Sequence, residues 1–230
     1  MEQKQRNRAK LFSPRYLVYD FVKLTAALPG LLWLRPKWRY ESEAAKKRIR
    51  GGALVISNHS GFFDPVNLMF AVWYRRHHFI CGKEFFETKA RWWFKHFLCI
   101  PIDRENFSFA TMREITDELK AGSLVSIFPE GHINGGGSLA AFKSGPVLIA
   151  LQGKAPIVPI YVKPKAHFYN RVTFVIGEPI DLFARYGKRP PMSEIDAIAE
   201  ELQSKEEALK QIANEKRRKQ HADTNQRDLP

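Results

Sequence analysis

ALVISNHSGFFDP, residues 53–65, is the stretch of this chain that decides its fold class. Its first five residues, 53–57, are almost all apolar and are typical of a strand buried on both faces. Asp64 and Pro65 are typical of a helix start, because Asp is a favoured N-cap and Pro fits the first helical position. The stretch therefore predicts a strand, a short loop that carries His59, and a helix.

Strands and helices are predicted to alternate outward from this unit, over residues 51–177. Short apolar runs predict the strands, and apolar positions three or four residues apart predict the helices. This alternation favours an α/β fold with a mixed, mostly parallel sheet flanked by helices. The predicted strands are 53–57, 79–81, 98–102, 124–128, 157–162 and 172–176, and the predicted helices are 65–74, 107–120 and 193–219.

The chain divides into three predicted parts. Residues 1–50 hold a basic arm and an apolar segment, 14–40, which is expected to form one or two short helices broken at Pro29-Gly30. Residues 51–185 are expected to form the α/β domain. Residues 186–230 are expected to form a polar helix and a disordered basic tail.

The apolar segment 14–40 is bracketed by basic residues and tryptophans. This pattern favours an amphipathic helix on a bilayer surface, anchored by Trp33, Trp38 and Arg35. The alternative is a helix packed on the core of the same domain. No run of about 18–20 purely apolar residues is present. No small-residue cleavage site follows the apolar run that comes after the charged first ten residues, so no signal peptide is expected. The protein is therefore expected to be peripheral or monotopic, at the cytoplasmic face of a membrane.

A net charge of +13 indicates an anionic partner. Nucleic acid, anionic lipid and a phosphorylated substrate all qualify, and solubility alone is the other interpretation. Five Trp and seventeen Phe are many for a basic nucleic-acid-binding protein, and no nucleic-acid-binding module is recognisable. An anionic membrane surface is therefore expected, and no nucleic acid. Cys81 and Cys99 lie in apolar runs, which predicts buried structural thiols and a reducing compartment.

The loop of residues 58–64 pairs a histidine with a carboxylate. Gly61 allows a tight turn that folds Asp64 back onto the imidazole of His59. Such a carboxylate fixes the tautomer and leaves the other ring nitrogen to accept a proton. The pair is then a base and its orienter. The alternatives are that Asp64 is only an N-cap and that His59 is only a loop residue.

Three further motifs lie in predicted strands or directly after them. In open α/β sheets, functional sites gather at the carboxyl ends of the strands. Glu130 follows a buried strand and must be paired or near water, so it binds a substrate hydroxyl, holds a basic residue, or simply belongs to a turn. Arg104 offers a fork for phosphate, or forms a surface ion pair. Pro159 is one of two prolines that restrict its strand to an edge or an irregular path, as channel lining or as plain core.

Together these motifs resemble the phospholipid/glycerol acyltransferase family, which includes the lysophosphatidic acid acyltransferases. That family carries NHxxxxD, then an Arg after a short apolar strand, then FPEG, then an apolar strand with proline. The resemblance covers about residues 14–180. The matching residues are Asn58-His59 with Asp64, Ile102-Asp103-Arg104, Phe128-Pro129-Glu130-Gly131 and Val158-Pro159, with lesser matches at Lys83-Glu84-Phe85 and Phe142-Lys143-Ser144-Gly145.

The resemblance implies transfer of a fatty acyl group from acyl-CoA or acyl carrier protein to a lysophospholipid hydroxyl, above all that of 1-acylglycerol-3-phosphate. Backbone N–H groups at the helix mouth, at Ser60 and Gly61, are expected to stabilise the oxyanion. No metal is expected, because no cluster has ligand spacing, and no cofactor beyond the acyl thioester. The implied roles are general base for His59, orienting carboxylate for Asp64, phosphate ligand for Arg104, acceptor binding for Glu130 and Gly131, and acyl-donor strand for Pro159.

The chain departs from the family where FPEG often continues as TRS, since it has His132-Ile133-Asn134 there. The missing Arg removes an expected phosphate contact. Either Arg104, Lys83 or Lys143 compensates, or the acceptor is another lysolipid or glycerol 3-phosphate. A family member that binds lipid without turnover is the remaining alternative.

Overall fold

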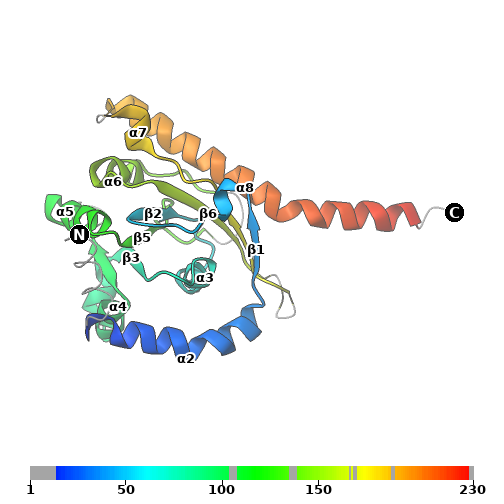
Figure 1. Cartoon of the computed structure of the whole chain (residues 1–230), viewed down its shortest axis with the longest axis horizontal. Helices are drawn as coiled ribbons and strands as arrows, with labels where there is room; N and C mark the ends of the chain where they lie inside the picture. Colours follow the sequence, from blue (N-terminus) through cyan, green and yellow to red (C-terminus); the bar gives the residue numbers. More distant parts are fainter. Residues whose placement is uncertain are drawn as a thin grey trace.

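The computed structural model describes residues 14–103, 108–134, 139–165, 167, 170–187 and 190–227. They form one seven-stranded sheet in the order β1-β7-β6-β2-β5-β3-β4 (Figure 1). Neighbouring strands are parallel except for the antiparallel pair β6–β7, which confirms the mixed, mostly parallel sheet. The strands are β1 (Lys37–Tyr40), β2 (Ala53–Ile56), β3 (His77–Gly82), β4 (Cys99–Ile102), β5 (Leu124–Ile127), β6 (Ile157–Lys163) and β7 (Thr173–Ile176).

Helices cover both faces of the sheet. On one face α5, α6, α7 and α8 pack against Leu54 and Ile56 of β2, and on the other face α3 and the end of α2 pack against Ala53 and Val55. Successive residues of β2 thus enter two apolar cores, which explains its unbroken apolar run. The helices are α2 (Leu17–Leu34), α3 (Asp64–Ala71), α4 (Arg91–His96), α5 (Phe109–Lys120), α6 (Gly145–Gly153), α7 (Leu182–Tyr186) and α8 (Met192–Arg227), with 3-10 turns η1 (Pro14–Tyr16), η2 (Ala44–Lys46) and η3 (Lys83–Glu87).

Strand β6 lies in the middle of the sheet, between β2 and β7. Its prolines predicted either an edge position or an irregular path, and the structure has the second. Pro159 is tolerated because it lies at a β-bulge. Between the pairs Ile157↔Ile180 and Ile160↔Ile176, β6 has two residues and the opposing chain has three. The missing N–H of Pro159 therefore falls where the ladder is already interrupted.

The apolar segment forms one continuous helix, α2, followed by β1, and not two short helices. Pro29 lies inside α2, although proline removes one intrahelical hydrogen bond. Close packing holds this part of the helix on the domain, because a Cβ at Gly30 would lie 2.2 Å from Cζ of Phe70 in α3. Strand β1, grouped with the N-terminal part in the sequence analysis, is an edge strand of the same sheet.

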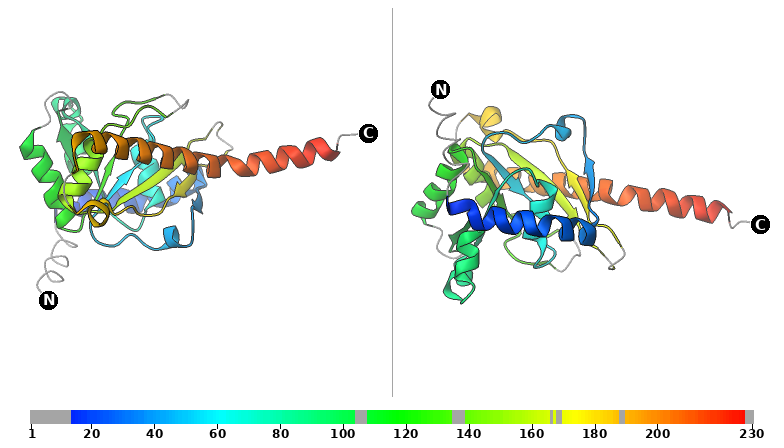
Figure 2. Two further views of the ribbon diagram at one scale, coloured as in Figure 1. Left: turned by 90° about the horizontal axis from the view of Figure 1, so that it is seen from above. Right: turned by 60° about the horizontal axis from the view of Figure 1, so that its bottom comes forward.

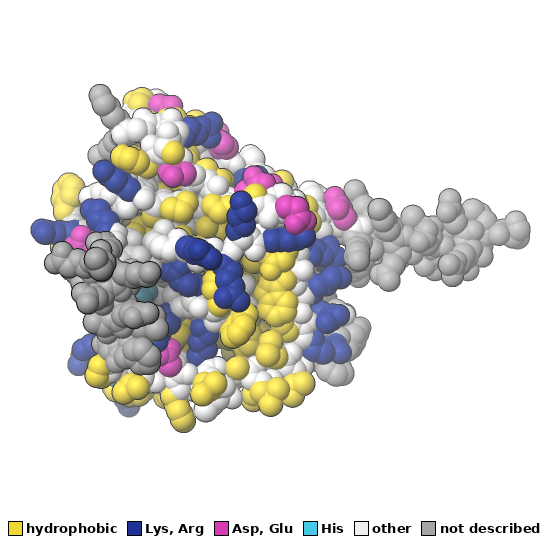
Figure 3. All heavy atoms as spheres, viewed as in Figure 1, with side chains coloured by type: hydrophobic (Ala, Val, Ile, Leu, Met, Phe, Trp, Pro, Cys, Tyr) yellow, Lys and Arg dark blue, Asp and Glu magenta, His cyan; other side chains and the backbone are white. Residues whose placement is uncertain are grey.

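Two charged residues of α2 face the domain, and most of its large apolar residues face outward. Asp20 forms an ion pair with Arg76 at 2.6 Å, and Lys23 Nζ donates to the carbonyl oxygen of Arg75 at 2.8 Å. Figure 3 shows hydrophobic side chains along the lower edge, where α2 lies in Figure 1. The exposed residues, here called the outer stripe, are Leu17, Phe21, Leu24, Leu28, Leu31, Leu32 and Trp33.

Helix α8 is longer than the helix predicted at residues 193–219. Leu209 and Ala213 of α8 pack on Tyr161 of β6 and Val175 of β7, and the C-terminal part of the helix extends beyond the domain in both views of Figure 2. The backbone is helical up to Arg227, where a disordered tail was expected.

Candidate active site

Two loops meet at one edge of the sheet. Residues 57–63 follow β2 and residues 128–131 follow β5, and these strands are parallel neighbours paired from Ala53↔Leu124 to Ile56↔Ile127. Their carboxyl ends therefore lie side by side, as the position of the motifs predicted.

Asp64 is the centre of the first loop. Its Oδ2 lies 3.0 Å from Nδ1 of His59, 2.6 Å from the N of Ser60 and 2.7 Å from the N of Gly61. The residue is only 2% exposed, and each of these bonds runs back to the loop. Asp64 thus holds the loop and the imidazole together instead of acting only as an N-cap of α3.

His59 is fixed through its ring and through its main chain. The ring stacks on Phe128, with 4.2 Å between centroids and 17° between planes. The main-chain N–H of His59 donates to Oε1 of Glu130 at 3.0 Å, and its main-chain carbonyl accepts from the N of Asn134 at 2.8 Å. Because Asp64 binds Nδ1, Nε2 is the ring nitrogen left to exchange a proton.

Glu130 is a buried carboxylate that binds main-chain amides. It is 2% exposed, and its second oxygen accepts from the N of Ala140 at 3.3 Å. Its bonds run to the backbone at both ends, so it ties the β5 loop to the loop of His59. Neither a substrate hydroxyl nor a basic side chain is needed to satisfy it.

Asn58 extends the sheet by one step through its side chain. Its Nδ2 donates to the carbonyl of Val162 at 3.0 Å, and its Oδ1 accepts from the N of Val162 at 2.8 Å. The side chain therefore replaces a main-chain partner for β6 just before His59. Sequence analysis took Asn58 only as part of the motif, although a polar residue directly after a buried strand was a signal for such a role.

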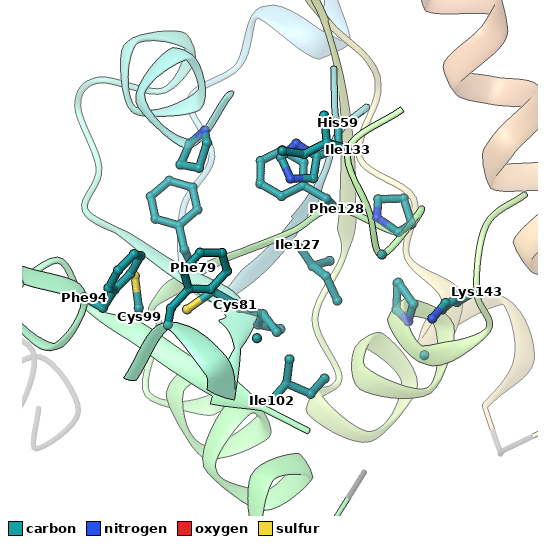
Figure 4. A pocket seen from close by; sticks show the side chains of 18 of the residues that line it. His59, Phe79, Cys81, Phe94, Cys99, Ile102, Ile127, Phe128, Ile133 and Lys143 are labelled. Carbon is teal, nitrogen blue, oxygen red and sulfur yellow. The ribbon is translucent and has the colours of Figure 1, made fainter. Parts of the chain in front are cut away.

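An apolar cavity of about 530 Å³ lies beside His59 (Figure 4). Its walls come from the two loops and from α3, β3, β4, η3, α4 and α6. Cys81 and Cys99 line it and are only partly buried, so these thiols are cavity walls and not core. A hydrogen bond with Cys81, and then burial, raise the pKa of Cys99. The size and the apolar lining suit a small-molecule ligand with a hydrocarbon part.

Lys143 and Gly131 lie together on the cavity wall. In Figure 4, Lys143 lies across the cavity from the rings of Phe79 and Phe94. Gly131 has a φ of 75°, and a Cβ there would lie 3.1 Å from Cε of Lys143. Glycine is therefore needed both for the left-handed backbone and for the approach of the lysine.

The other predicted phosphate ligands are less directly placed. Lys83 Nζ forms an ion pair with Oδ2 of Asp103 at 2.7 Å, and Asp103 lines the cavity while Lys83 does not. Arg104 lies outside the described residues. Among the described residues, no group of three or more His, Cys, Asp or Glu side chains is arranged to hold a metal ion.

Two expected roles do not fit this geometry. The N–H groups of Ser60 and Gly61 both donate to Asp64, so they are not available to an oxyanion. Pro159 is buried in β6 beside Gly177, at 2.8 Å from a Cβ placed there, and it is not part of the cavity wall. The strand with the prolines therefore supports the site from behind and does not shape the cavity.

Glu206 of α8 is a buried carboxyl behind these loops that sequence analysis did not single out. It is 0% exposed, and neither carboxyl oxygen has a hydrogen-bond partner that meets normal geometry among the described residues. Burial raises its pKa well above the usual value, the facing N–H of Asn58 opposes this, and the charge of Glu130 adds to it. Its spacing from Leu202 and Leu209 places it on the buried side of α8, which was the available sequence signal.

A histidine held by a buried carboxylate, at the carboxyl edge of an α/β sheet and beside an apolar cavity, is an arrangement typical of an enzyme active site. Residues 39–163 match the acyltransferase family. The chain belongs to this family, and it is an O-acyltransferase.

Similar proteins carry more specific names. The chain is 30% identical to a 1-acyl-sn-glycerol-3-phosphate acyltransferase of Bacillus subtilis, over 71% of this chain and 82% of that protein. It is also 30% identical to a protein of the same name from Streptococcus pneumoniae, over 71% of this chain and 64% of that protein. The crystal structure of a 1-acyl-sn-glycerophosphate (LPA) acyltransferase from Thermotoga maritima matches 86% of this chain and 81% of its own, with a TM-score of 0.59 and 20% identity. That likeness confirms the fold.

Proposed function

We propose that this acyltransferase moves a fatty acyl group from a thioester to the free hydroxyl of 1-acylglycerol-3-phosphate, giving phosphatidic acid, with His59 as general base. The proposal is carried by the 3.0 Å contact between Nδ1 of His59 and the buried Asp64, beside an apolar cavity. The two bacterial relatives named 1-acyl-sn-glycerol-3-phosphate acyltransferase support the choice of acceptor.

The proton moves through Nε2 of His59. As the acceptor hydroxyl oxygen bonds to the thioester carbonyl carbon, Nε2 takes the hydroxyl proton. The tetrahedral intermediate then collapses, the carbon–sulfur bond breaks, and the imidazolium returns the proton to the leaving thiolate. Asp64 stabilises the imidazolium between these steps, because an opposite charge beside Nδ1 favours the charged ring.

Transfer is direct in this scheme, without an acyl-enzyme. The hydroxyl oxygen of Ser60 accepts from Nδ2 of Asn58 at 3.1 Å, while the ring of His59 is bound to Asp64. Ser60 is therefore not paired with the base, as an activated nucleophile would be. Detection of an acyl group on Ser60 by mass spectrometry during turnover would contradict this assignment.

The cavity holds the acyl chain, and Lys143 binds the acceptor phosphate. Among the described residues that line the cavity, Lys143 is the only lysine or arginine. Lys83 forms an ion pair with Asp103 instead. Lys143 thus takes the part of the arginine that is missing at Ile133. Arg104 remains a second phosphate ligand, on the resemblance alone. Glu130 and Gly131 act by fixing this loop.

The protein attaches to a membrane through α2. By length and composition alone, α2 is the one helix of the described residues that is apolar enough to cross a bilayer. Its inward ion pair and its contact with Phe70 keep it lying along the domain, so the outer stripe rests in the interface as a peripheral or monotopic anchor. The free thiols of Cys81 and Cys99 fit the cytoplasmic side.

The test is acyl transfer from labelled long-chain acyl-CoA and acyl carrier protein to a panel of acceptors in detergent. The panel contains lysophosphatidic acid, glycerol 3-phosphate and other lysolipids, with His59→Ala beside the wild type. Turnover of lysophosphatidic acid that is lost in His59→Ala is expected. Preference for another acceptor would replace the substrate but keep the mechanism, and no turnover with any pair would favour a lipid-binding role.

A further inference from the structure

Three cations that are distant in sequence gather at the C-terminal end of α2. Arg35 ends the helix, Lys165 follows β6, and Arg171 precedes β7. Arg171 Nε donates to the carbonyl of Arg35 at 3.0 Å. Lys165 donates to the carbonyl of Trp33 and lies 4.8 Å from the centre of the Trp33 ring.

No carboxylate of the described residues neutralises these three cations. None of the three forms an ion pair with a carboxylate in the part of the chain that the structure describes, and Arg35 and Arg171 are exposed. Partial burial, and then the charge of Arg35, lower the pKa of Lys165. Like charges held together repel one another, so the arrangement is favourable when an anion is shared between them.

The cluster lies where an interfacial phosphate would be. It adjoins the outer stripe, whose residues contact acyl chains in the proposed membrane-bound state, and Trp33 is typical of the headgroup level. Trp33 also contacts Phe63 of the catalytic loop, with 6.1 Å between ring centres. Because β6 is parallel to β2, Lys165 lies at the same edge of the sheet as His59.

We propose that Arg35, Lys165 and Arg171 bind the phosphate of an anionic phospholipid of the membrane, which sets the orientation of the catalytic loop at the bilayer. The inference rests on the proposed membrane attachment through α2. Two guanidinium groups and an ammonium group offer the charge-assisted donors that a phosphodiester accepts. The apolar stripe alone would bind neutral and anionic bilayers alike, whereas this cluster makes binding depend on the headgroup.

Other cations near α2 in sequence do not join the cluster. Arg39 donates to the carbonyl of Ile212 in α8, and Lys46 forms an ion pair with Glu43. Lys47, Arg50 and Lys120 are exposed and lie before β2 or at the end of α5, toward the opposite edge of the sheet. The last three therefore provide a control with the same loss of charge.

The experiment measures sedimentation of the full chain with vesicles of phosphatidylcholine alone, or of equal parts phosphatidylcholine and phosphatidylglycerol. Binding of Arg35→Gln/Lys165→Gln/Arg171→Gln to the anionic vesicles should fall by about 10–100-fold, and much less for Lys47→Gln/Arg50→Gln/Lys120→Gln. Equal loss in the two triple variants would overturn the proposal, because binding would then follow net charge alone. Wild-type binding to neither vesicle would instead overturn the membrane attachment itself.

Two further measurements keep the roles apart. Arg35→Gln alone removes a side chain that makes no hydrogen bond among the described residues, so it should fold normally and still weaken binding to anionic vesicles. In detergent, the triple cluster variant should keep its KM for the lysolipid acceptor within about two-fold. A large rise of that KM would overturn the proposal and assign the cluster to the acceptor.

Discussion

The His59 side of the cavity is built from buried groups bound to the main chain, whereas the Lys143 side is built from an exposed side chain. Asp64 and Glu130 are each 2% exposed and bind backbone amides, while Lys143 is exposed. Proton transfer needs reacting atoms placed within a fraction of an ångström. Binding a phosphate needs mainly charge. Under the proposed mechanism, the reaction is therefore fixed by the fold, and the acceptor headgroup is set by replaceable residues.

Replacing His59 tests the rigid side most directly. His59→Ala should lower kcat by about 10³–10⁴-fold, because no other base is placed beside the acceptor hydroxyl. The measurement is single-turnover acyl transfer with saturating lysophosphatidic acid. The unfolding free energy should fall by only about 1–3 kcal/mol, because the 17% exposed imidazole makes one side-chain hydrogen bond and one ring stack. Activity within ten-fold of wild type would mean that another group is the base.

Asp64→Asn tests whether the carboxylate, and not only its shape, is needed. A neutral amide does not stabilise the positive charge that forms on the imidazole of His59 during proton transfer. The kcat should therefore fall by about 10²-fold. Because an amide oxygen is a weaker acceptor than a carboxylate oxygen for the N–H groups of Ser60 and Gly61, the unfolding free energy should also fall, by about 1–3 kcal/mol. Asp117→Asn, on the exposed surface of α5, is the control. Loss of stability without loss of kcat would make Asp64 purely structural.

Lys143→Ala tests the exposed side. The KM for lysophosphatidic acid should rise by about 10-fold while kcat changes little, as expected for one lost charge-assisted contact. Monoacylglycerol, which lacks the phosphate, should show no such change. Lys83→Ala should have a smaller effect, because Lys83 is engaged by Asp103. If Lys143→Ala left the KM for lysophosphatidic acid unchanged, Lys143 would not be a phosphate ligand.

The sequence predicts the rigid side better than the exposed side. The strand before His59 and the helix after Asp64 follow from local patterns, and Gly61 indicates the turn between them. The family resemblance adds Glu130. Local patterns do not contain partnership across the sheet, such as that of Asn58 with Val162. They also do not show which groups the Asp64 carboxylate binds within its own loop, namely the amides of Ser60 and Gly61. Those contacts reversed the expected oxyanion role and explain why it could not be predicted.

Two details of the fold have a similar origin. The prolines of β6 predicted an edge strand or an irregular path without deciding between them, and a one-residue bulge opposite Pro159 allows a central position. The bulge depends on β7 and Ile180, which lie beyond any local pattern. Likewise, the apolar run 14–40 predicted a break at Pro29, and the contact of Gly30 with Phe70 holds one continuous helix.

Glu206→Gln asks whether the rigid side extends behind the loop into α8. Because burial raises the folded-state pKa of Glu206, the unfolded chain releases this proton at lower pH than the folded protein. The contribution of Glu206 to the unfolding free energy should therefore be fully present below the usual glutamate pKa and be lost as pH rises above it. Glu206→Gln should raise Tm at pH 8 by about 2–4 °C and leave it unchanged near pH 4.

Glu207→Gln, at the half-exposed neighbouring position, should show no such gain. A lower Tm of Glu206→Gln at both pH values would mean that Glu206 is ionised and bound by the amide of Asn58, which would make α8 part of the scaffold that positions His59.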